Sequence, residues 1–150
     1  MNWILRIIGG LNPIKKSFDD FVKIAGFEDD LRSYSQTKGY FQKWKYRVFC
    51  VSGVVHNFSV LLGEEEEDEK MLSMQNDTPH MALDFVFPLS ALDGINEGDL
   101  VTVQGTLVAY TNFGGEALAE GRAGCSSWPH FIFAKCKITA VYDRNGNKKQ

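Results

Sequence analysis

Hydrophobic positions repeat with two different periods along this chain, helical before Tyr40 and strand-like after it. Between Asn12, a residue type that often caps a helix, and Gly26, a type that often ends one, apolar residues recur at the spacing of a single buried helix face. These residues are Phe18, Phe21, Val22 and Ala25. We therefore expect an amphipathic helix here, then a second short helix over 28–34 and a turn over 35–39.

From Tyr40 onward apolar residues alternate with polar ones, which is the pattern of half-buried β-strands. The alternation predicts five strands, at 46–55, 58–62, 81–87, 100–109 and 131–142, with the second as the hairpin partner of the first. The segment 88–92 between the third and fourth strands is expected to form a helical turn. We expect long exposed loops over 63–79 and 110–129.

Two of the expected strands carry a glycine at the same place in an otherwise apolar face. Gly53 follows Phe49 and Val51 at alternate positions, and Gly105 follows Val101 and Val103 in the same way. A glycine inside a strand often marks a bulge or a bend, as at the corner of a small barrel. The expected fold class is therefore mainly β, a five-stranded OB-fold-like barrel with N-terminal amphipathic helices.

This interpretation divides the chain into a helical segment over 1–39 that packs on the barrel, the barrel itself over 40–143, and a frayed polar tail over 144–150. Within the barrel region a Gly-Asp pair precedes a Val-x-Val-x-Gly strand, and the closing strand carries Cys136 between two lysines. The segments 45–55, 83–87, 98–107 and 135–138 carry these features. They resemble small bacterial OB-fold proteins of the tRNA-anticodon-binding-like group. The resemblance implies the fold and leaves the ligand open, because this fold hosts many tasks.

Length and composition indicate how many domains the chain forms, and the distribution of charge bears on what it binds. The 150 residues, 44% of them hydrophobic and 23% charged, suit one globular domain. The net charge of −3 argues against a protein that coats nucleic acid by charge alone. Lysine and arginine nevertheless outnumber the acids, nine to five, in residues 1–50, and six to one in residues 121–150. A local basic face therefore remains open.

The candidate binding residues come from two segments in which aromatic and basic side chains interleave. If residues 132, 134, 136, 138 and 140 face inward, their neighbours on the last strand face outward. Stacking rings beside a basic groove are how OB-folds hold single strands. The candidates are Tyr40, Lys43, Trp44, Lys45, Arg47, Phe131, Phe133, Lys135 and Lys137. The alternative interpretation is that these aromatic side chains are buried beneath the N-terminal helices.

Other chemistry finds little support in the sequence. His56, His80 and His130 lack metal-ligand spacing, and no nucleophile has an evident base, so we expect no catalytic residue, no metal and no cofactor. The three cysteines, Cys50, Cys125 and Cys136, are interpreted as buried free thiols. The acidic run 64–69 is expected to be a solvated loop rather than a cation site.

The opening apolar stretch, residues 3–8, is too short to span a bilayer. It is either a terminal helix packed on the barrel or a membrane-surface anchor, and a cytoplasmic location without integral membrane insertion is expected. The sequence as a whole predicts a non-catalytic binding module whose partner is single-stranded DNA or RNA. The alternative is a protein-interaction or regulatory adaptor, which accounts equally well for the acidic middle of the chain.

Overall fold

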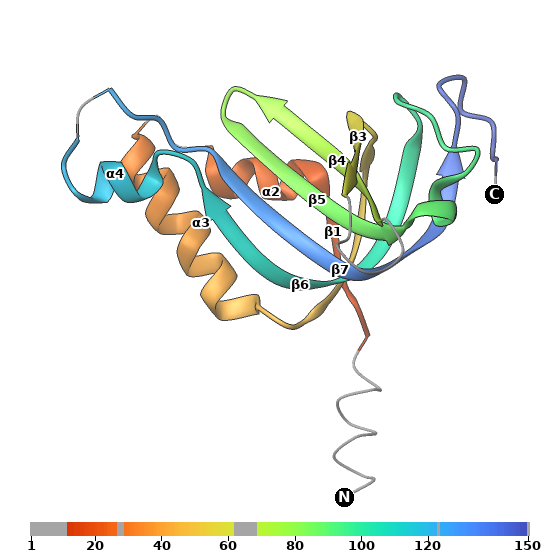
Figure 1. The fold of residues 1–150 in the computed structure, drawn as a ribbon, viewed down its shortest axis with the longest axis horizontal. Coiled ribbons are helices and arrows are strands. Elements are labelled where there is room, and N and C mark those ends of the chain that lie inside the picture. The colour runs from red at the N-terminus through yellow and green to blue at the C-terminus, as the bar shows by residue number, and fades with distance from the viewer. Residues whose placement is uncertain (1–11, 27–28, 62–68, 123, 150) are drawn as a thin grey trace, which may run out of the picture.

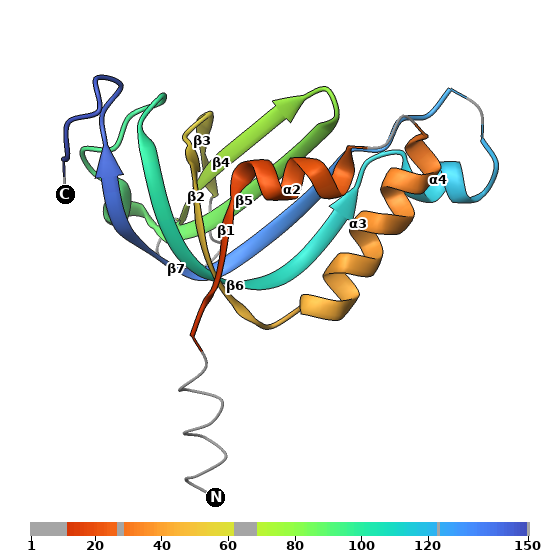
Figure 2. The same ribbon diagram turned by 180° about the vertical axis from the view of Figure 1, so that it is seen from behind.

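The computed structural model of the chain describes residues 12–26, 29–61, 69–122 and 124–149. One strongly curved β-sheet forms the body of the molecule, with α2 and α3 packed against its inner face (Figures 1 and 2). The elements in chain order are β1 Ile14–Ser17, α2 Phe18–Ala25, α3 Asp30–Trp44, β2 Val48–Val54, β3 Asn57–Leu61, β4 Glu69–Asp77, β5 His80–Pro88, the 3-10 turn Leu89–Leu92, β6 Leu100–Asn112, α4 Gly115–Ala119 and β7 Pro129–Tyr142.

The sheet has seven strands in the order β1-β2-β6-β7-β5-β4-β3. The pairs β1–β2 and β5–β7 are parallel and the others are antiparallel. The mainly β class is therefore confirmed. The expected five-stranded closed barrel is wrong in strand number and in closure, because the edge strands β1 and β3 do not pair with each other among the described residues. The two additional strands are β1, from a segment predicted as the start of a helix, and β4, from a segment predicted as a loop.

The chain crosses directly from one region of the sheet to another between β2 and β3. Val55 donates its backbone N–H to the carbonyl of Asp99 at 2.9 Å, and His56 donates its own to the carbonyl of Ser73 at 2.8 Å. These bonds join the crossing to the residue that precedes β6 and to β4. The expected hairpin between these two strands is therefore wrong, since β2 pairs with β6 and β3 pairs with β4.

Helix α2 begins later than the sequence predicts. Ser17 caps it, accepting a hydrogen bond from the backbone of Asp20, whose carboxylate accepts one from the Ser17 N–H in return. The preceding residues 14–17 are extended and pair with β2. The expected apolar stripe is confirmed, because Phe21 and Ala25 are fully buried.

Helix α3 runs through the turn that the sequence predicts over 35–39. Tyr34 and Thr37 are buried, and the Thr37 hydroxyl hydrogen-bonds to the Ser33 carbonyl at 2.8 Å and to the Tyr110 hydroxyl at 2.7 Å. Packing on β6 therefore outweighs the weak helix propensity of this segment. As a consequence the last turn of α3 carries Lys43 and Trp44.

The two strand glycines have different roles. Gly105 lies at a register shift between β6 and β7, so the bulge expected there is confirmed. Gly53 stays in regular register with Val101, and a Cβ at Gly53 would lie 2.5 Å from the Met74 sulfur and 2.9 Å from the Phe18 Cβ. Close packing of α2 and β4, rather than a bulge, accounts for the glycine at this position.

Hydrogen bonds join the described residues of the C-terminal tail to the rest of the chain. Lys149 donates its backbone N–H to Val141 at 2.8 Å, and its ammonium group lies 2.9 Å from the buried Asp99 carboxylate. Arg144 donates to the Glu97 carbonyl at 2.8 Å. The stretch 3–8 and residues 64–68 of the acidic run lie outside the described residues.

Candidate functional site

A short segment of alternating cations and rings joins the end of α3 to the start of β2. We call residues 43–47 the cationic strip. Trp44 is half-buried against the core, whereas Tyr46 is 69% exposed. Tyr46 has a φ of 68°, in the left-handed region that few non-glycine residues adopt, while its N–H donates to the Leu107 carbonyl at 2.7 Å. The backbone bond to β6 therefore holds the Tyr46 residue where its ring projects from the surface.

The cations of the strip lie over these rings. The Lys43 ammonium is 5.1 Å from the Trp44 ring centre, and the Arg47 guanidinium is 5.7 Å from it. The Lys45 ammonium is 5.8 Å from the Tyr46 ring centre. These separations are those of cation–π contacts. The strip therefore presents positive charge and an exposed aromatic face within five residues.

The predicted aromatic platform is largely core. Phe131 and Phe133 are fully buried, so the prediction that they face outward is wrong. The Tyr40 ring lies 5.9 Å from that of Phe131, and Phe21 of α2 contacts Tyr40, Phe131 and Phe133. Burial raises the pKa of Tyr40 to about 12. For Phe131 and Phe133 the alternative interpretation, burial beneath an N-terminal helix, is confirmed, whereas Tyr40 lies on α3 itself and is half-buried.

The lysines of the last strand are exposed on the outer surface, as predicted. Lys135 has a φ of 53° and lies at the register shift opposite Gly105, which changes the side of the sheet to which successive residues point. Lys137 pairs with Gln104, which in turn pairs with Cys50 of β2. Strand β6 therefore separates Lys137 from β2, and the structure does not merge the two halves of the predicted site into one groove.

A groove of about 510 Å³ runs between α3 and β6 and shares Lys45 with the cationic strip. We call it the α3–β6 groove. It is lined by Tyr34, Lys38, Phe41, Gln42, Lys45, Tyr110, Thr111, Asn112 and Glu116. Most of these residues come from segments predicted to be a turn or a loop, which is why the sequence did not identify them.

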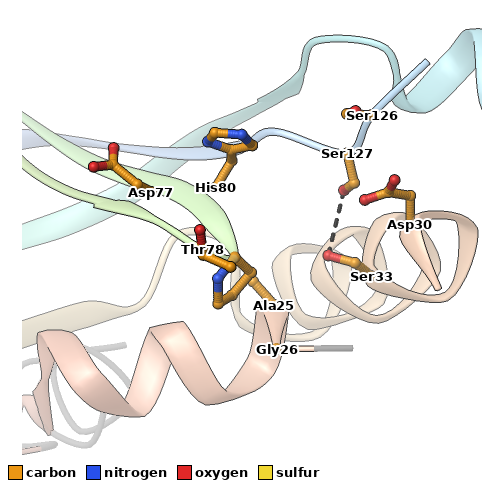
Figure 3. Close-up of a pocket in the computed structure, with 10 residues that line it drawn as sticks. Ala25, Gly26, Asp30, Ser33, Asp77, Thr78, His80, Ser126 and Ser127 are labelled. Carbon is orange, nitrogen blue, oxygen red and sulfur yellow. Dashed lines mark hydrogen bonds between the residues drawn. The ribbon is translucent and has the colours of Figure 1, made fainter. Parts of the chain in front are cut away.

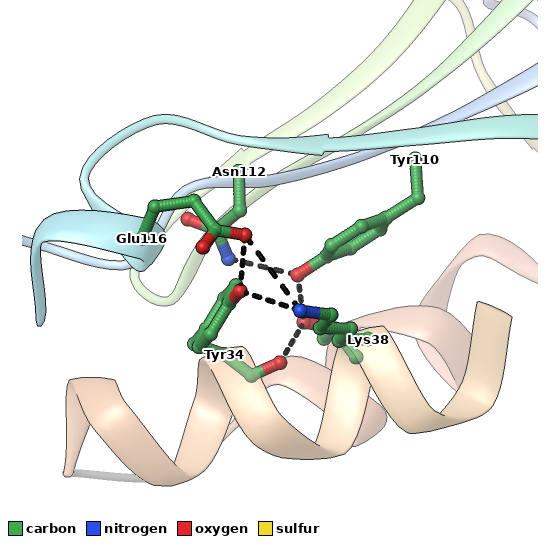
Figure 4. A network of polar contacts seen from close by, with 6 residues as sticks. Tyr34, Lys38, Tyr110, Asn112 and Glu116 are labelled. Atoms are coloured by element: carbon green, nitrogen blue, oxygen red, sulfur yellow. Dashed lines mark hydrogen bonds and ion pairs between the residues drawn. The ribbon is translucent and has the colours of Figure 1, made fainter. Parts of the chain in front are cut away.

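Polar contacts fix one wall of the α3–β6 groove (Figure 4). The Tyr34 hydroxyl donates to the Glu116 carboxylate, while the Lys38 ammonium donates to that hydroxyl at 3.0 Å and lies 3.7 Å from the carboxylate. The hydrogen bond to Tyr34, with the charge of Glu116, raises the pKa of Lys38. Lys38 therefore keeps its proton, and the carboxylate of Glu116 compensates part of its positive charge. Lys45 is the other cation that lines this groove.

The aromatic side of the same groove is formed by Phe41 and Tyr110. Their rings are stacked with centres 5.9 Å apart and an interplanar angle of 21°. The Tyr110 hydroxyl is held by Thr37 at 2.7 Å and by the Asn112 amide at 2.9 Å. This wall is therefore positioned before any ligand arrives.

Potential catalytic and metal-binding groups are few in the part of the chain that the structure describes. That part contains no cluster of three or more His, Cys, Asp or Glu residues arranged to hold a metal ion. Asp84 accepts hydrogen bonds from Ser73 at 2.6 Å and from His130 at 2.9 Å, but the other His130 ring nitrogen is buried without a partner. The three cysteines are unpaired and half-buried rather than fully buried.

None of the helices within the described ranges is long and apolar enough to cross a bilayer.

The chain matches no protein-family model, and no curated protein is significantly similar to it. A solved structure from Klebsiella pneumoniae subsp. pneumoniae MGH 78578, described as a "putative nucleic acid-binding lipoprotein", superposes on it with a TM-score of 0.51. The identity is 14%, over 89% of this chain and 95% of the other. At this identity the likeness shows that the two chains share a fold.

Proposed function

We propose that this chain is a non-catalytic module that binds single-stranded nucleic acid along the cationic strip and the adjoining α3–β6 groove. The observation that carries the proposal is Tyr46, whose ring is exposed, whose backbone N–H is bonded to β6, and whose ring has the Lys45 ammonium beside it. A base can stack on such a ring, and the lysine can neutralise the adjacent phosphate. Because the chain as a whole carries a net charge of −3, the attraction for phosphate must come from this local surface.

The proposal includes a relationship of this sheet to the OB-fold. With 48–61 counted as one bent strand, β4, β5, β6 and β7 complete a set of five, to which β1 is added at one edge, and a 3-10 turn separates the third from the fourth. OB-folds are partly open five-stranded Greek-key barrels that bind oligonucleotides. The sequence resemblance to the anticodon-binding-like group agrees with this assignment. The Klebsiella protein adds support, since its description names nucleic-acid binding.

The first test measures the affinity of the purified chain for a fluorescent 12-nucleotide single strand, by anisotropy, at about 50 mM salt. Replacing Tyr46 by glycine keeps the positive φ and removes the ring. Since stacking contributes about 1–3 kcal/mol per base, the Kd is expected to rise roughly fivefold to a hundredfold. Tyr142→Ala, which removes another exposed ring at the far end of β7, is the matched control and should leave the Kd unchanged.

The second test concerns charge. Lys45→Ala should weaken binding and reduce the dependence of log K on log salt by about 0.7, the value for one phosphate contact on a single strand. Lys23→Ala, on the exposed face of α2, should change neither quantity. Absence of binding by the unaltered protein at low salt would overturn the proposal and favour the protein-interaction or regulatory adaptor instead.

A further inference from the structure

A second cavity, of about 420 Å³, lies at the start of α3, the end opposite the cationic strip. Figure 3 shows residues that line it. It opens between the end of α2, the start of α3, the β4–β5 turn and the residues just before β7. It is lined by Ala25, Gly26, Asp30, Ser33, Asp77, Thr78, Pro79, His80, Ser126 and Ser127. We call it the acidic pocket. Its volume is at the small end of the range for ligand sites, which suits one ring system.

One wall of the acidic pocket is a supported aromatic ring. The His80 ring stacks on Trp128, with centres 4.9 Å apart and an interplanar angle of 24°. Trp128 in turn lies 5.9 Å from His130, which is anchored by Asp84. The His80 face is therefore backed by a second ring that lies just before β7, an arrangement suited to stacking a planar ligand.

The other walls are rich in hydrogen-bond acceptors. Asp30 from α3 and Asp77 from the end of β4 line the pocket, and the Ser127 hydroxyl donates to the Ser33 hydroxyl at 3.3 Å. A carboxylate accepts hydrogen bonds and repels phosphate. In nucleic-acid recognition, aspartate and glutamate accept from the amino group of cytosine. The chemistry of this pocket therefore suits the edge of a base and not the backbone of the strand.

We propose that the acidic pocket holds one nucleobase that carries an exocyclic amino group, with the ring on His80 and the amino group donating to Asp77 or Asp30. This inference rests on the proposed function and adds to it a preference for amino-bearing bases over uracil and thymine. Uracil and thymine present a carbonyl oxygen where cytosine presents its amino group, so a carboxylate opposes them.

The distance between the two sites suits one bound strand. Asp30 and Trp44 are the first and last residues of α3, whose 15 residues span about 22 Å at 1.5 Å per residue. An OB-fold typically holds about 4–16 nucleotides, which is long enough to occupy both ends of the helix. The phosphates of such a strand contact the cationic strip, while one base enters the acidic pocket.

The experiment compares two 12-nucleotide strands, oligo(dC) and oligo(dU), which differ in the base edge alone. The unaltered protein is expected to bind oligo(dC) about tenfold more tightly, the size of one good base-edge contact. Asp77→Lys replaces an acceptor by a donor, so the preference should reverse toward oligo(dU). Asp93→Lys makes the same charge change at an exposed turn after the 3-10 helix and should leave the dC-to-dU ratio unaltered.

The outcomes separate this inference from the function on which it rests. If neither strand binds, both the proposed function and the pocket assignment are wrong, and a basic protein segment becomes the better occupant of the acidic pocket. If both strands bind equally, or if Asp77→Lys leaves their ratio unchanged, the pocket assignment is overturned while nucleic-acid binding stands. Thermal melts of both lysine variants verify that they remain folded.

Discussion

Replacement of Asp84 by leucine is expected to be among the most destabilising single changes in this protein. Asp84 is 4% exposed on β5, and its carboxylate accepts from the Ser73 hydroxyl at 2.6 Å and from His130 at 2.9 Å. A carboxylate can only accept, so His130 carries a proton on the nitrogen that faces it. Leucine has the same branched shape, with larger methyl groups in place of the oxygens and no acceptor, and it therefore leaves two buried donors without partners.

The magnitude follows from those two donors. A buried polar group left unpaired costs about 1–3 kcal/mol, so the expected loss in the free energy of unfolding for two such groups is about 2–6 kcal/mol. At about 2–4 °C per kcal/mol for a chain of this size, a loss of 3 kcal/mol lowers Tm by roughly 6–12 °C. Urea titration followed by the fluorescence of the tryptophans gives the free energy, and a thermal scan gives Tm.

A double-mutant cycle with Ser73→Ala tests the reasoning itself. In the unaltered protein Ser73→Ala removes a hydrogen bond and costs about 1 kcal/mol. In the Asp84→Leu background it removes an unpaired hydroxyl and should restore stability. This change of sign is the specific expectation. An equal cost in both backgrounds would refute the argument, because it would mean that the hydroxyl does not depend on Asp84.

Two further changes test other contacts. Gly105→Ala places a Cβ 2.6 Å from the Cys136 sulfur, so urea titration should show a loss of about 1–3 kcal/mol that Cys136→Ala largely restores; no restoration would contradict the clash. Burial opposes ionisation of Asp99, but the Asn96 N–H and the Lys149 ammonium outweigh it and hold the pKa of Asp99 below its usual value. The stability that this contributes is present above the unfolded pKa of about 3.9 and is lost as the pH falls through the folded pKa. Lys149→Met should therefore lower Tm at pH 7 by more than at pH 3, and a deficit independent of pH would contradict this assignment.

Strands with clear alternation were predictable from the sequence, and β4 was not. In β4 three consecutive residues, Leu72, Ser73 and Met74, are all buried, because both faces of the strand are covered at that point. Alternation of period two therefore disappears from the sequence, and the charged run before it favours a loop. The short β1 was missed for another reason, since its four residues hold too few positions to establish a period.

The course of α3 depends on contacts that no local pattern contains. Tyr34 meets Glu116, and Thr37 meets Tyr110, residues that lie 82 and 73 positions away in the sequence. The segment 35–39 has the composition of a turn, and its helical state comes from packing on β6 and α4. The α3–β6 groove exists because of this helix, so the sequence could not predict the groove.

Alternation along the last strand showed neither which face is buried nor that the buried face changes partway along the strand. Phe131 and Phe133 point to the core because they pack against the apolar face of α2, where Phe21 contacts both rings. The positive φ of Lys135 then changes the orientation of the residues that follow. The exposed lysines were predictable from charge, whereas the display of the Tyr46 ring depends on a left-handed residue that sequence patterns rarely reveal.

The charges on α3 also serve the helix, which determines the residues that can test function. Asp30 in the first turn and Lys43 in the last turn each stabilise the end of the helix dipole at which they lie. Substitution of either residue would alter α3 and its ligand contacts together, and the two effects could not be separated. Tyr46 and Asp77 lie outside α3, one before β2 and the other at the end of β4. A change in oligonucleotide affinity at Tyr46, or in base preference at Asp77, therefore reports on contact with the ligand rather than on the stability of the helix that joins the two sites.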